Sequence, residues 1–318
     1  MLLSMRVLAL RLFVVLLRLL PHRLSRSATR VLARLRYRRY RSGIRPKARN
    51  IRERLHVSCA EAEAILKRSF ELELAAIGDG ARFRSLRREN VSGVIEVRGL
   101  ERLDEALAAG RGAVMSTGHV AGFAVFFAAL GVLGYQPNLI RLRAHSSKGL
   151  LARWAYERYN KRLERHGCTT LWMDSGAFDV GVRALNALRR NEVVISPIDL
   201  TQSGDNARVT FLGAPALMPR GLAVLADISG APVLDFFVYR GADGRLVATI
   251  GEAWKVDDVD AGVQRSATAL EQHVREHPAD WSPWHVFDDW RTLRAERPTG
   301  HLTRARQDLD VGHLTAGA

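Results

Sequence analysis

The sequence predicts an α/β protein with a mixed, mainly parallel central sheet flanked by helices. Short apolar runs typical of buried strands recur along the chain, and helical patterns separate several of them. One such run, 114–117, is followed by an apolar segment, 121–133, as expected for a strand and its crossover helix. The length of 318 residues and hydrophobic fraction of 47% suit one large domain with an extension, or two small domains.

Local patterns predict the individual elements in order. Ser58 to Glu61 is a capping box that begins a helix reaching about residue 77. Gly110 is expected to end a helix over 100–109. The other predicted strands are 94–98, 138–143, 169–173, 193–197, 209–212, 233–239 and 246–250. The other predicted helices cover about 150–165, 176–190, 219–228 and 261–276, and the aromatic segment 281–290 closes the domain.

The N-terminal segment 1–21 is strongly apolar but is interrupted by Arg6, Arg11 and Arg18. A spanning helix needs about 20 apolar residues, which these charges do not allow. On a helical wheel, Arg11, Arg18 and His22 lie on one side, opposite a broad apolar face. The pattern favours a helix lying in the membrane interface. Docking of the helix on the protein's own core is the alternative interpretation.

Basic residues dominate the charge, with 48 Lys and Arg against 33 Asp and Glu, a net charge of +15. The segment 34–41 alone carries five arginines with interleaved tyrosines. Nucleic acid would suit such a segment. Its position after an interfacial helix favours anionic lipid instead, at about 1 kcal/mol per basic residue. We therefore expect a membrane-associating segment over 1–55, the α/β domain over 56–290 and a polar tail over 291–318, peripherally bound to the cytoplasmic face of the inner membrane.

His119 is the first candidate for a catalytic residue. It follows the predicted strand 114–117, at the end where open α/β sheets bind ligands. Gly118 and Gly122 flank it and allow close approach to the backbone. A neutral imidazole can take a proton from an attacking hydroxyl. A helix cap or loop hydrogen bond is the alternative role. Cys59 and Cys168 have no metal-ligand spacing, and no phosphate-binding loop or G-x-S-x-G elbow is present.

Several blocks, taken in order, resemble one known family. Residues 97–112 resemble the approach to its histidine, 198–200 and 209–219 its third block, 223–240 its next strand and 277–281 its final segment. The chain resembles the bacterial lauroyl/myristoyl acyltransferases of lipid A biosynthesis, members of the lysophospholipid acyltransferase superfamily. Related enzymes acylate mycobacterial mannosylated phosphatidylinositol. The resemblance implies a glycerol-3-phosphate acyltransferase-like fold.

The same resemblance implies transfer of an acyl chain from acyl carrier protein or acyl-CoA to a hydroxyl, less often an amine, of a lipid-like acceptor. His119 matches the general base and Asp199 an acidic residue of the third block. Arg143, or alternatively Arg141, matches an arginine that binds the acceptor's polar head. The substrate-binding glycines would be Gly213, at the Phe-Leu-Gly turn of the third block, and Gly122 beside the histidine. No metal or bound cofactor is implied, because the thioester carries the activated acyl group.

The sequence departs from the family's H-x4-D/E motif, because Ala124 stands at the acidic position. A carboxylate distant in sequence, such as Asp174 or Asp199, would replace it, with Asp235 as a further candidate. An amine acceptor would demand less of the base. The alternative is a catalytically inactive relative that binds lipid or acyl carrier protein.

Overall fold

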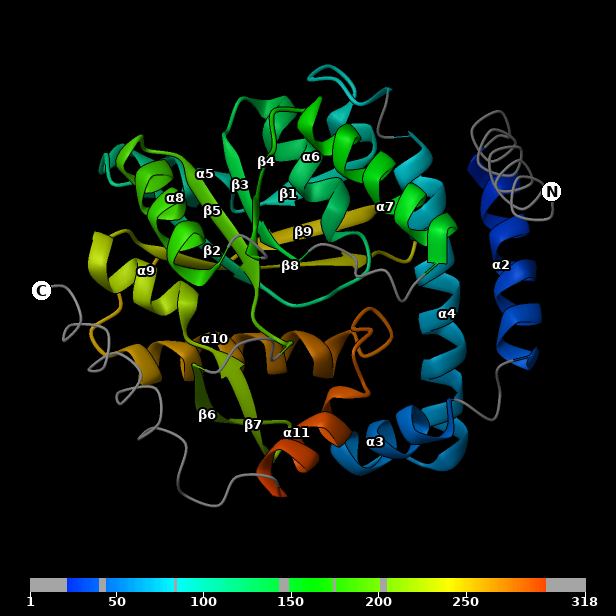
Figure 1. Cartoon of the computed structure of the whole chain (residues 1–318). Helices are drawn as coiled ribbons and strands as arrows, with labels where there is room; N and C mark the ends of the chain where they lie inside the picture. The colour runs from blue at the N-terminus through cyan, green and yellow to red at the C-terminus, as the bar shows by residue number, and fades with distance from the viewer. Residues whose placement is uncertain are drawn as a thin grey trace, which may run out of the picture.

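A seven-stranded sheet forms the centre of the computed structural model (Figure 1). The structure describes residues 22–39, 44–82, 85–142, 149–173, 176–200 and 205–295. The strands of this sheet are β1 Ile95–Arg98, β2 Ala113–Thr117, β3 Pro137–Arg141, β4 Thr169–Trp172, β5 Val193–Pro197, β8 Val233–Arg240 and β9 Leu246–Ile250.

The strand order is β1-β9-β8-β2-β5-β3-β4, and every neighbouring pair is parallel except β8 with β9. The predicted mixed, mainly parallel sheet is thereby confirmed. The strands β2, β5, β3, β4 and β8 share one direction, so the segments that follow them emerge at one edge of the sheet. That edge holds the ligand site in open parallel sheets.

Helices cover both faces of the sheet. They are α5 Leu100–Ala108, α6 Phe123–Leu133, α7 Gly149–Glu164, α8 Ala177–Arg189, α9 Gly221–Ser229 and α10 Val259–Glu276. Right-handed crossovers from β2 to β3 and back from β4 to β5 place α6 and α8 on opposite faces. On the α8 face, α8, α9 and α10 pack in series.

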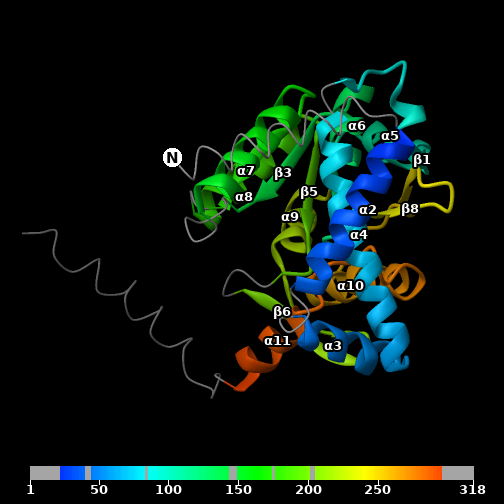
Figure 2. The ribbon, with the colours of Figure 1, turned by 90° about the vertical axis from the view of Figure 1, so that its right-hand side faces the viewer.

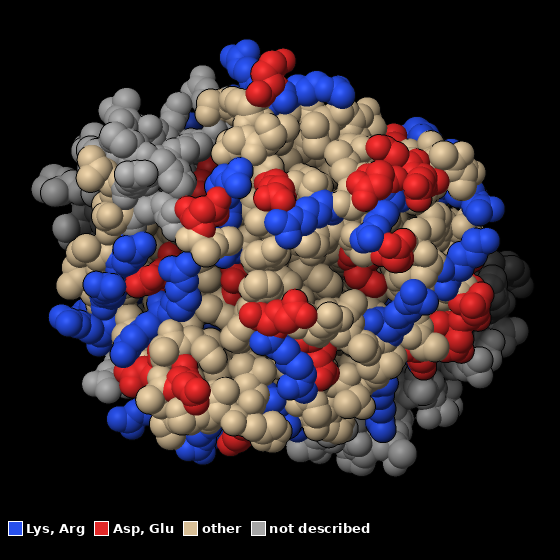
Figure 3. All heavy atoms as spheres, turned by 180° about the vertical axis from the view of Figure 1, so that it is seen from behind, with Lys and Arg blue, Asp and Glu red and all other residues tan. Residues whose placement is uncertain are grey.

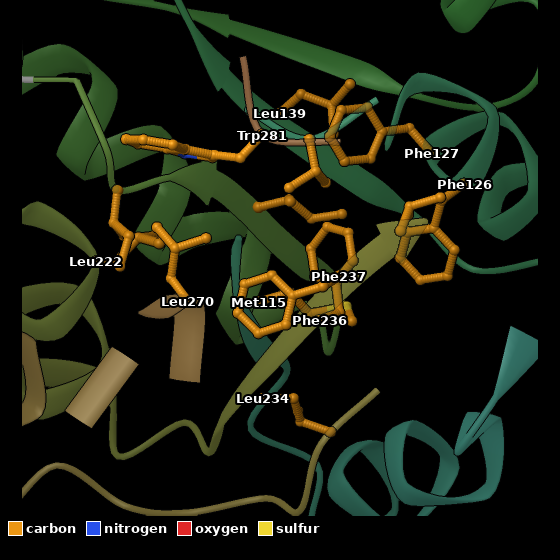
Figure 4. Packing of buried hydrophobic residues seen from close by; sticks show 14 of the residues in the cluster. Met115, Phe126, Phe127, Leu139, Leu222, Leu234, Phe236, Phe237, Leu270 and Trp281 are labelled. Atoms are coloured by element: carbon orange, nitrogen blue, oxygen red, sulfur yellow. The ribbon is translucent and has the colours of Figure 1, made fainter. Parts of the chain in front are cut away.

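Helix α6 is largely buried in the core; it begins just after Gly122 and ends before Gly134, both in the left-handed conformation. The N–H of Gly134 donates to the last carbonyls of the helix, as in a glycine C-cap. The ring centroids of Phe126 and Phe236 are 4.6 Å apart, and Figure 4 shows Phe127 beside them. Burying each such side chain stabilises the fold by about 1.5–3 kcal/mol.

A separate two-stranded sheet, β6 Asn206–Phe211 and β7 Ala214–Pro219, is an antiparallel hairpin outside the central sheet. The sequence predicts the first of these strands, over 209–212, but not the second. It groups that first strand with the strands of the central α/β pattern, and this assignment is wrong. The second strand was missed because Pro215 and Pro219 argue against a strand. Leu212 and Gly213 both have positive φ, at 49° and 68°, which is the geometry of a tight hairpin turn.

Three N-terminal helices pack beside the α/β core: α2 His22–Arg39, α3 Arg45–Leu55 and α4 Cys59–Arg82. Helix α4 packs against both others, and Figure 2 shows it alongside α2. The capping box is confirmed, because the N–H of Glu61 donates to Ser58 Oγ and the N–H of Ser58 donates to Glu61 Oε2. The predicted interfacial helix over 1–21 and most of the predicted tail lie outside the described residues.

The final helix, α11 Val286–Ala295, joins an aromatic cluster with the hairpin. Phe211 of β6 contacts the rings of Trp281, Phe287 and Trp290. Helix α3 supports this cluster from outside, since Asn50 is fully buried and donates to the carbonyl of Trp284. The hairpin and the N-terminal helices therefore meet at the segment between α10 and α11.

Candidate active site

The register between β2 and β5 brings His119 and Asp199 together. Thr117 pairs with Pro197 at the ends of these two parallel strands. His119 and Asp199 each stand two residues beyond that pair, so both emerge at the same place on the same edge. Nδ1 of His119 lies 2.6 Å from Oδ1 of Asp199. The structure thus joins the predicted base with the predicted acidic residue.

Asp199 receives two further hydrogen bonds, both at Oδ2. The backbone N–H of His119 donates to this oxygen at 2.6 Å, and Nε1 of Trp281 donates to it at 2.8 Å. The carboxylate is completely buried, whereas 30% of the His119 side chain is exposed. The imidazole therefore has one nitrogen held inside the protein, which leaves Nε2 as the nitrogen for a substrate.

Burial and charge act in opposite directions on this pair. Burial alone would raise the pKa of Asp199, but the adjacent His119 ring and the hydrogen bonds lower it below its ordinary value. Burial alone would lower the pKa of His119, and the charge and hydrogen bond of Asp199 raise it above its ordinary value. The charge of Arg141 opposes this increase. The carboxylate therefore favours the protonated imidazole, as a general base requires after taking a proton.

The loop that carries His119 is held by the segment 280–282. The N–H of Ala121 donates to the carbonyl of Asp280 at 2.8 Å, and the N–H of Ser282 donates to the carbonyl of His119 at 3.2 Å. Val120 and Trp281 form the corresponding antiparallel bridge. The main chain on both sides of the imidazole is therefore fixed by the same short segment.

The two predicted glycines near His119 contact the protein's own groups. A Cβ on Gly118 would lie 2.6 Å from Leu270 and 3.1 Å from Asp199 Oδ2, so the absence of a side chain lets the carboxylate approach. Gly122 has a φ of 91° at the start of α6, with Leu246 beside it. The substrate-binding role predicted for Gly122 stays a prediction.

Arg141 ends β3 at the same edge of the sheet. Its guanidinium lies over the ring of Tyr159, 4.8 Å from the centroid, and donates to Asn160 Oδ1 at 2.5 Å. Its positive charge is near enough to His119 to oppose the increase in the pKa of that imidazole. The other predicted arginine, Arg143, lies outside the described residues, as does Asp174.

Gly213 lies at the tip of the hairpin between β6 and β7. It has no atom within 4 Å of an added Cβ, apart from those of its chain neighbours. The hairpin contacts the site indirectly. Phe211 of the hairpin packs its ring against that of Trp281, with 5.5 Å between the centroids. The predicted role in substrate binding is not tested by this arrangement.

Asp235 is not the replacement carboxylate. Its Oδ1 accepts hydrogen bonds from Ser116 Oγ at 2.6 Å and Ser266 Oγ at 2.5 Å, and its Oδ2 accepts one from Trp254 Nε1 at 3.0 Å. These donors satisfy the carboxylate inside the sheet and explain its presence in a buried strand. The carboxylate that contacts the His119 imidazole belongs to Asp199.

No role for Trp281 is predicted from the sequence, whereas in the structure its Nε1 donates to the carboxylate of Asp199. The available signal was the block 277–281, which resembles the end of the family's pattern. Within the described parts of the chain, no three His, Cys, Asp or Glu side chains are grouped to hold a metal ion.

The fold and site define an α/β protein with a histidine–carboxylate pair at the C-terminal ends of parallel strands in a mixed sheet. A family model described as bacterial lipid A biosynthesis acyltransferase matches residues 4–286, which is most of the chain. The chain therefore belongs to the bacterial lipid A biosynthesis acyltransferase family, and the resemblance predicted from the sequence is confirmed.

Two curated relatives carry the name phosphatidylinositol mannoside acyltransferase. They come from Mycobacterium tuberculosis, strains CDC 1551 / Oshkosh and ATCC 25618 / H37Rv, and each is 30% identical to this chain over 190 residues. The alignments cover 58% of this chain and 57% of each relative. The matched region thus spans less than two thirds of the relatives' length.

Proposed function

We propose that this protein transfers a fatty acyl chain from acyl carrier protein or acyl-CoA to a hydroxyl of a lipid or glycolipid acceptor. His119 would act as the general base. The observation that carries the proposal is the contact of 2.6 Å between His119 Nδ1 and Asp199 Oδ1 in a chain of this family. An amine acceptor would use the same site.

The chemistry follows from this pair. Asp199 holds the proton on Nδ1, so Nε2 accepts the proton of the acceptor hydroxyl. The hydroxyl oxygen attacks the thioester carbonyl, and the carbon–sulfur bond breaks as the ester bond forms. The thiol leaves with the proton that His119 accepted. Asp199 stabilises the imidazolium between these steps.

The acceptor we propose is a glycolipid with a phosphate-containing head group. The name of the two relatives points to such a lipid. Arg141 supports this choice because it carries a positive charge toward His119 from the end of β3. We retain Arg143 as the second arginine of the predicted acceptor site. The basic surface would also suit an acidic carrier protein or the phosphates of coenzyme A.

We further propose that the protein binds peripherally to the cytoplasmic face of the inner membrane through its N-terminal segment. On α2, Leu24, Val31 and Leu35 are more than half exposed, at 56%, 58% and 57%, among many arginines. Such a mixture suits an anionic lipid surface. On the face in Figure 3, in contrast, basic and acidic side chains are interspersed. No helix within the described ranges has the length and apolarity to cross a bilayer.

A specific observation favours the enzyme over an inactive lipid-binding relative. The inactive alternative depended on Ala124, which removes the acidic residue from the motif. Asp199 brings a carboxylate within hydrogen-bonding distance of the imidazole, which is the arrangement expected of an active base.

The test is acyl transfer by the purified protein beside its His119→Ala variant. Labelled acyl carrier protein and acyl-CoA donors are each supplied with membrane lipid extract from the native host, and products are identified by mass. A His119-dependent lipid product supports the proposal. The matched control is His166→Ala, because His166 precedes β4 at the opposite edge of the sheet. A folded wild-type protein that forms no product with either donor contradicts the proposal.

A further inference from the structure

We propose that Trp281 is a positioning residue that holds Asp199 in the orientation needed to serve His119. The inference rests on the proposed function. Among the groups assigned a role in the reaction, Trp281 hydrogen-bonds to the carboxylate of Asp199. It would act only through the carboxylate, by the hydrogen bond from Nε1 to Oδ2 at 2.8 Å.

The geometry of Asp199 gives this hydrogen bond its importance. A carboxylate can rotate about the bond that joins it to the rest of its side chain. Oδ1 contacts the imidazole, while Oδ2 accepts from the backbone of His119 and from Trp281. The two donors at Oδ2 fix the plane of the carboxylate and thereby aim Oδ1 at Nδ1. Because the carboxylate is fully buried, no solvent water would replace a lost donor.

Trp281 is itself held rigidly. Its ring centroid lies 4.8 Å from that of Trp284, 5.5 Å from that of Phe211 and 6.1 Å from that of Phe287. The side chain is completely buried, so the indole has no freedom to turn its N–H elsewhere. A rigid donor is well suited to holding a buried carboxylate.

The same residue is joined to the histidine through its backbone. Trp281 bridges Val120, and its neighbours Asp280 and Ser282 hydrogen-bond to Ala121 and His119. The segment therefore holds both partners, the base through the main chain and the carboxylate through the indole. Beyond it, Lys47 of α3 donates to the carbonyl of Ser282 at 3.3 Å, so the segment is braced from outside as well.

The experiment compares Trp281→Phe with Trp284→Phe. Both residues are buried indoles of one aromatic cluster, but the indole N–H of Trp284 donates to the carbonyl of Pro278. The readouts are kcat, KM, the pH profile of acyl transfer and the pKa of His119 measured by NMR titration. Thermal unfolding of both variants reports their stability.

We expect Trp281→Phe to lower kcat by about tenfold to a hundredfold with KM changed less than about twofold. The measured pKa of His119 should fall toward 6.5, since the raised value depends on the orientation of Asp199. Trp284→Phe should lose similar stability while keeping kcat and the pKa of His119. Equal losses of kcat in both folded variants, or an unchanged pKa in Trp281→Phe, would overturn the proposal.

A second measurement covers the case in which Trp281→Phe does not fold. In the unsubstituted protein, the indole N–H resonance of Trp281 should move with the titration of His119, because both donate to Asp199. This movement should vanish in His119→Gln. An indole N–H resonance of Trp281 that does not shift as His119 titrates contradicts the proposal. If the wild type transfers no acyl chain, the proposed function fails, whereas the NMR results still decide the role of Trp281.

Discussion

The carboxylate of Asp199 meets the Nδ1 atom of His119 at 2.6 Å, although the two residues are 80 positions apart in the chain. The contact depends on the parallel pairing of β2 with β5, which aligns the residues at the two strand ends. If His119 is the base, as we propose, its acidic partner therefore comes from the end of a neighbouring strand rather than from the helix that follows the histidine. Ala124 in that helix is consequently compatible with catalysis.

Replacing Asp199 by asparagine should lower kcat by about 10⁴, the cost of the corresponding change in a serine-protease triad. An asparagine in this place cannot stabilise the imidazolium and permits the wrong tautomer of His119. Single-turnover acyl transfer would measure the loss. The matched control is Asp235→Asn, which alters another buried, fully hydrogen-bonded carboxylate. The folded fraction of Asp235→Asn should keep the kcat of the wild type. An equal loss of kcat in the two variants would contradict the role proposed for Asp199.

The strands and the position of His119 were predictable because their patterns are local. The run 114–117 and the glycines around the histidine are visible in a few residues of sequence. Asp199 was a candidate through resemblance, but its contact was not predictable. Which strand pairs with β2, and in which register, depends on packing across the whole sheet.

The contact of Trp281 and the strand β7 are two further features that could not be predicted from the sequence. The pattern around Trp281 indicates only an apolar closing segment, because the direction of a single indole N–H follows from tertiary packing. In β7, Pro215 and Pro219 argue against a strand by local rules. The hairpin tolerates Pro215 because Thr210 opposite it bonds through its backbone to the Gln264 side chain. It tolerates Pro219 because that residue ends β7.

The pH profile should report the environment of His119. As the proposed base, His119 must be neutral to accept a proton, and Asp199 raises the pKa of His119 above 6.5 against the effect of burial. Accordingly, kcat/KM should rise with pH and level off above that raised pKa. Arg141→Gln should shift the rise of kcat/KM to still higher pH, because the positive charge of Arg141 opposes protonation of the His119 ring. Arg183→Gln, a change at an exposed arginine of α8, should leave the pH of this rise unchanged. Equal shifts in the two variants would exclude a specific effect of Arg141.

Gly122→Ala should lower the free energy of unfolding by about 1–2 kcal/mol, the cost of a left-handed residue with a side chain. Its φ is 91°, and the added Cβ would lie 2.7 Å from a methyl group of Leu246. Chemical denaturation would measure the change. Gly181→Ala provides the opposite case, because Gly181 lies inside α8 with no atom within 4 Å of an added Cβ beyond its own chain neighbours and helix backbone. That variant should gain about 0.5–1 kcal/mol.

Asn50→Ala should show that α3 supports the active-site segment. Nδ2 of the fully buried Asn50 donates to the carbonyl of Trp284 at 2.8 Å and to Asp288 Oδ2 at 3.1 Å. Leaving these groups without a donor should cost about 1–3 kcal/mol in the free energy of unfolding. The kcat of the folded variant should stay within about twofold of wild type, because neither lost hydrogen bond is made to His119, Asp199 or Trp281. Asn186→Ala, on the exposed side of α8, should change stability by less than about 0.5 kcal/mol.

Asp280 should make the protein less stable as the pH rises. Burial raises the pKa of this carboxyl from 3.8 to about 7, although Arg240 and Arg68 oppose the increase, and its Oδ1 has no hydrogen-bond partner. Between pH 3.8 and about 7 the folded state retains a proton that the unfolded state has released. Stability from this group is therefore complete below pH 3.8 and declines until the pH exceeds the folded pKa, by at most about 4 kcal/mol.

Asp280→Asn removes this titration, so it should raise the melting temperature at pH 8 and have little effect near pH 4. A gain of 1 kcal/mol corresponds to about 2–4 °C in a protein of this size class. Asp257→Asn, at an exposed position, is the control and should shift melting equally at both pH values. A gain for Asp280→Asn that is the same at pH 4 and pH 8 would mean that the asparagine stabilises by better packing. The pKa of Asp280 would then be the same in the folded and the unfolded states, which contradicts the prediction.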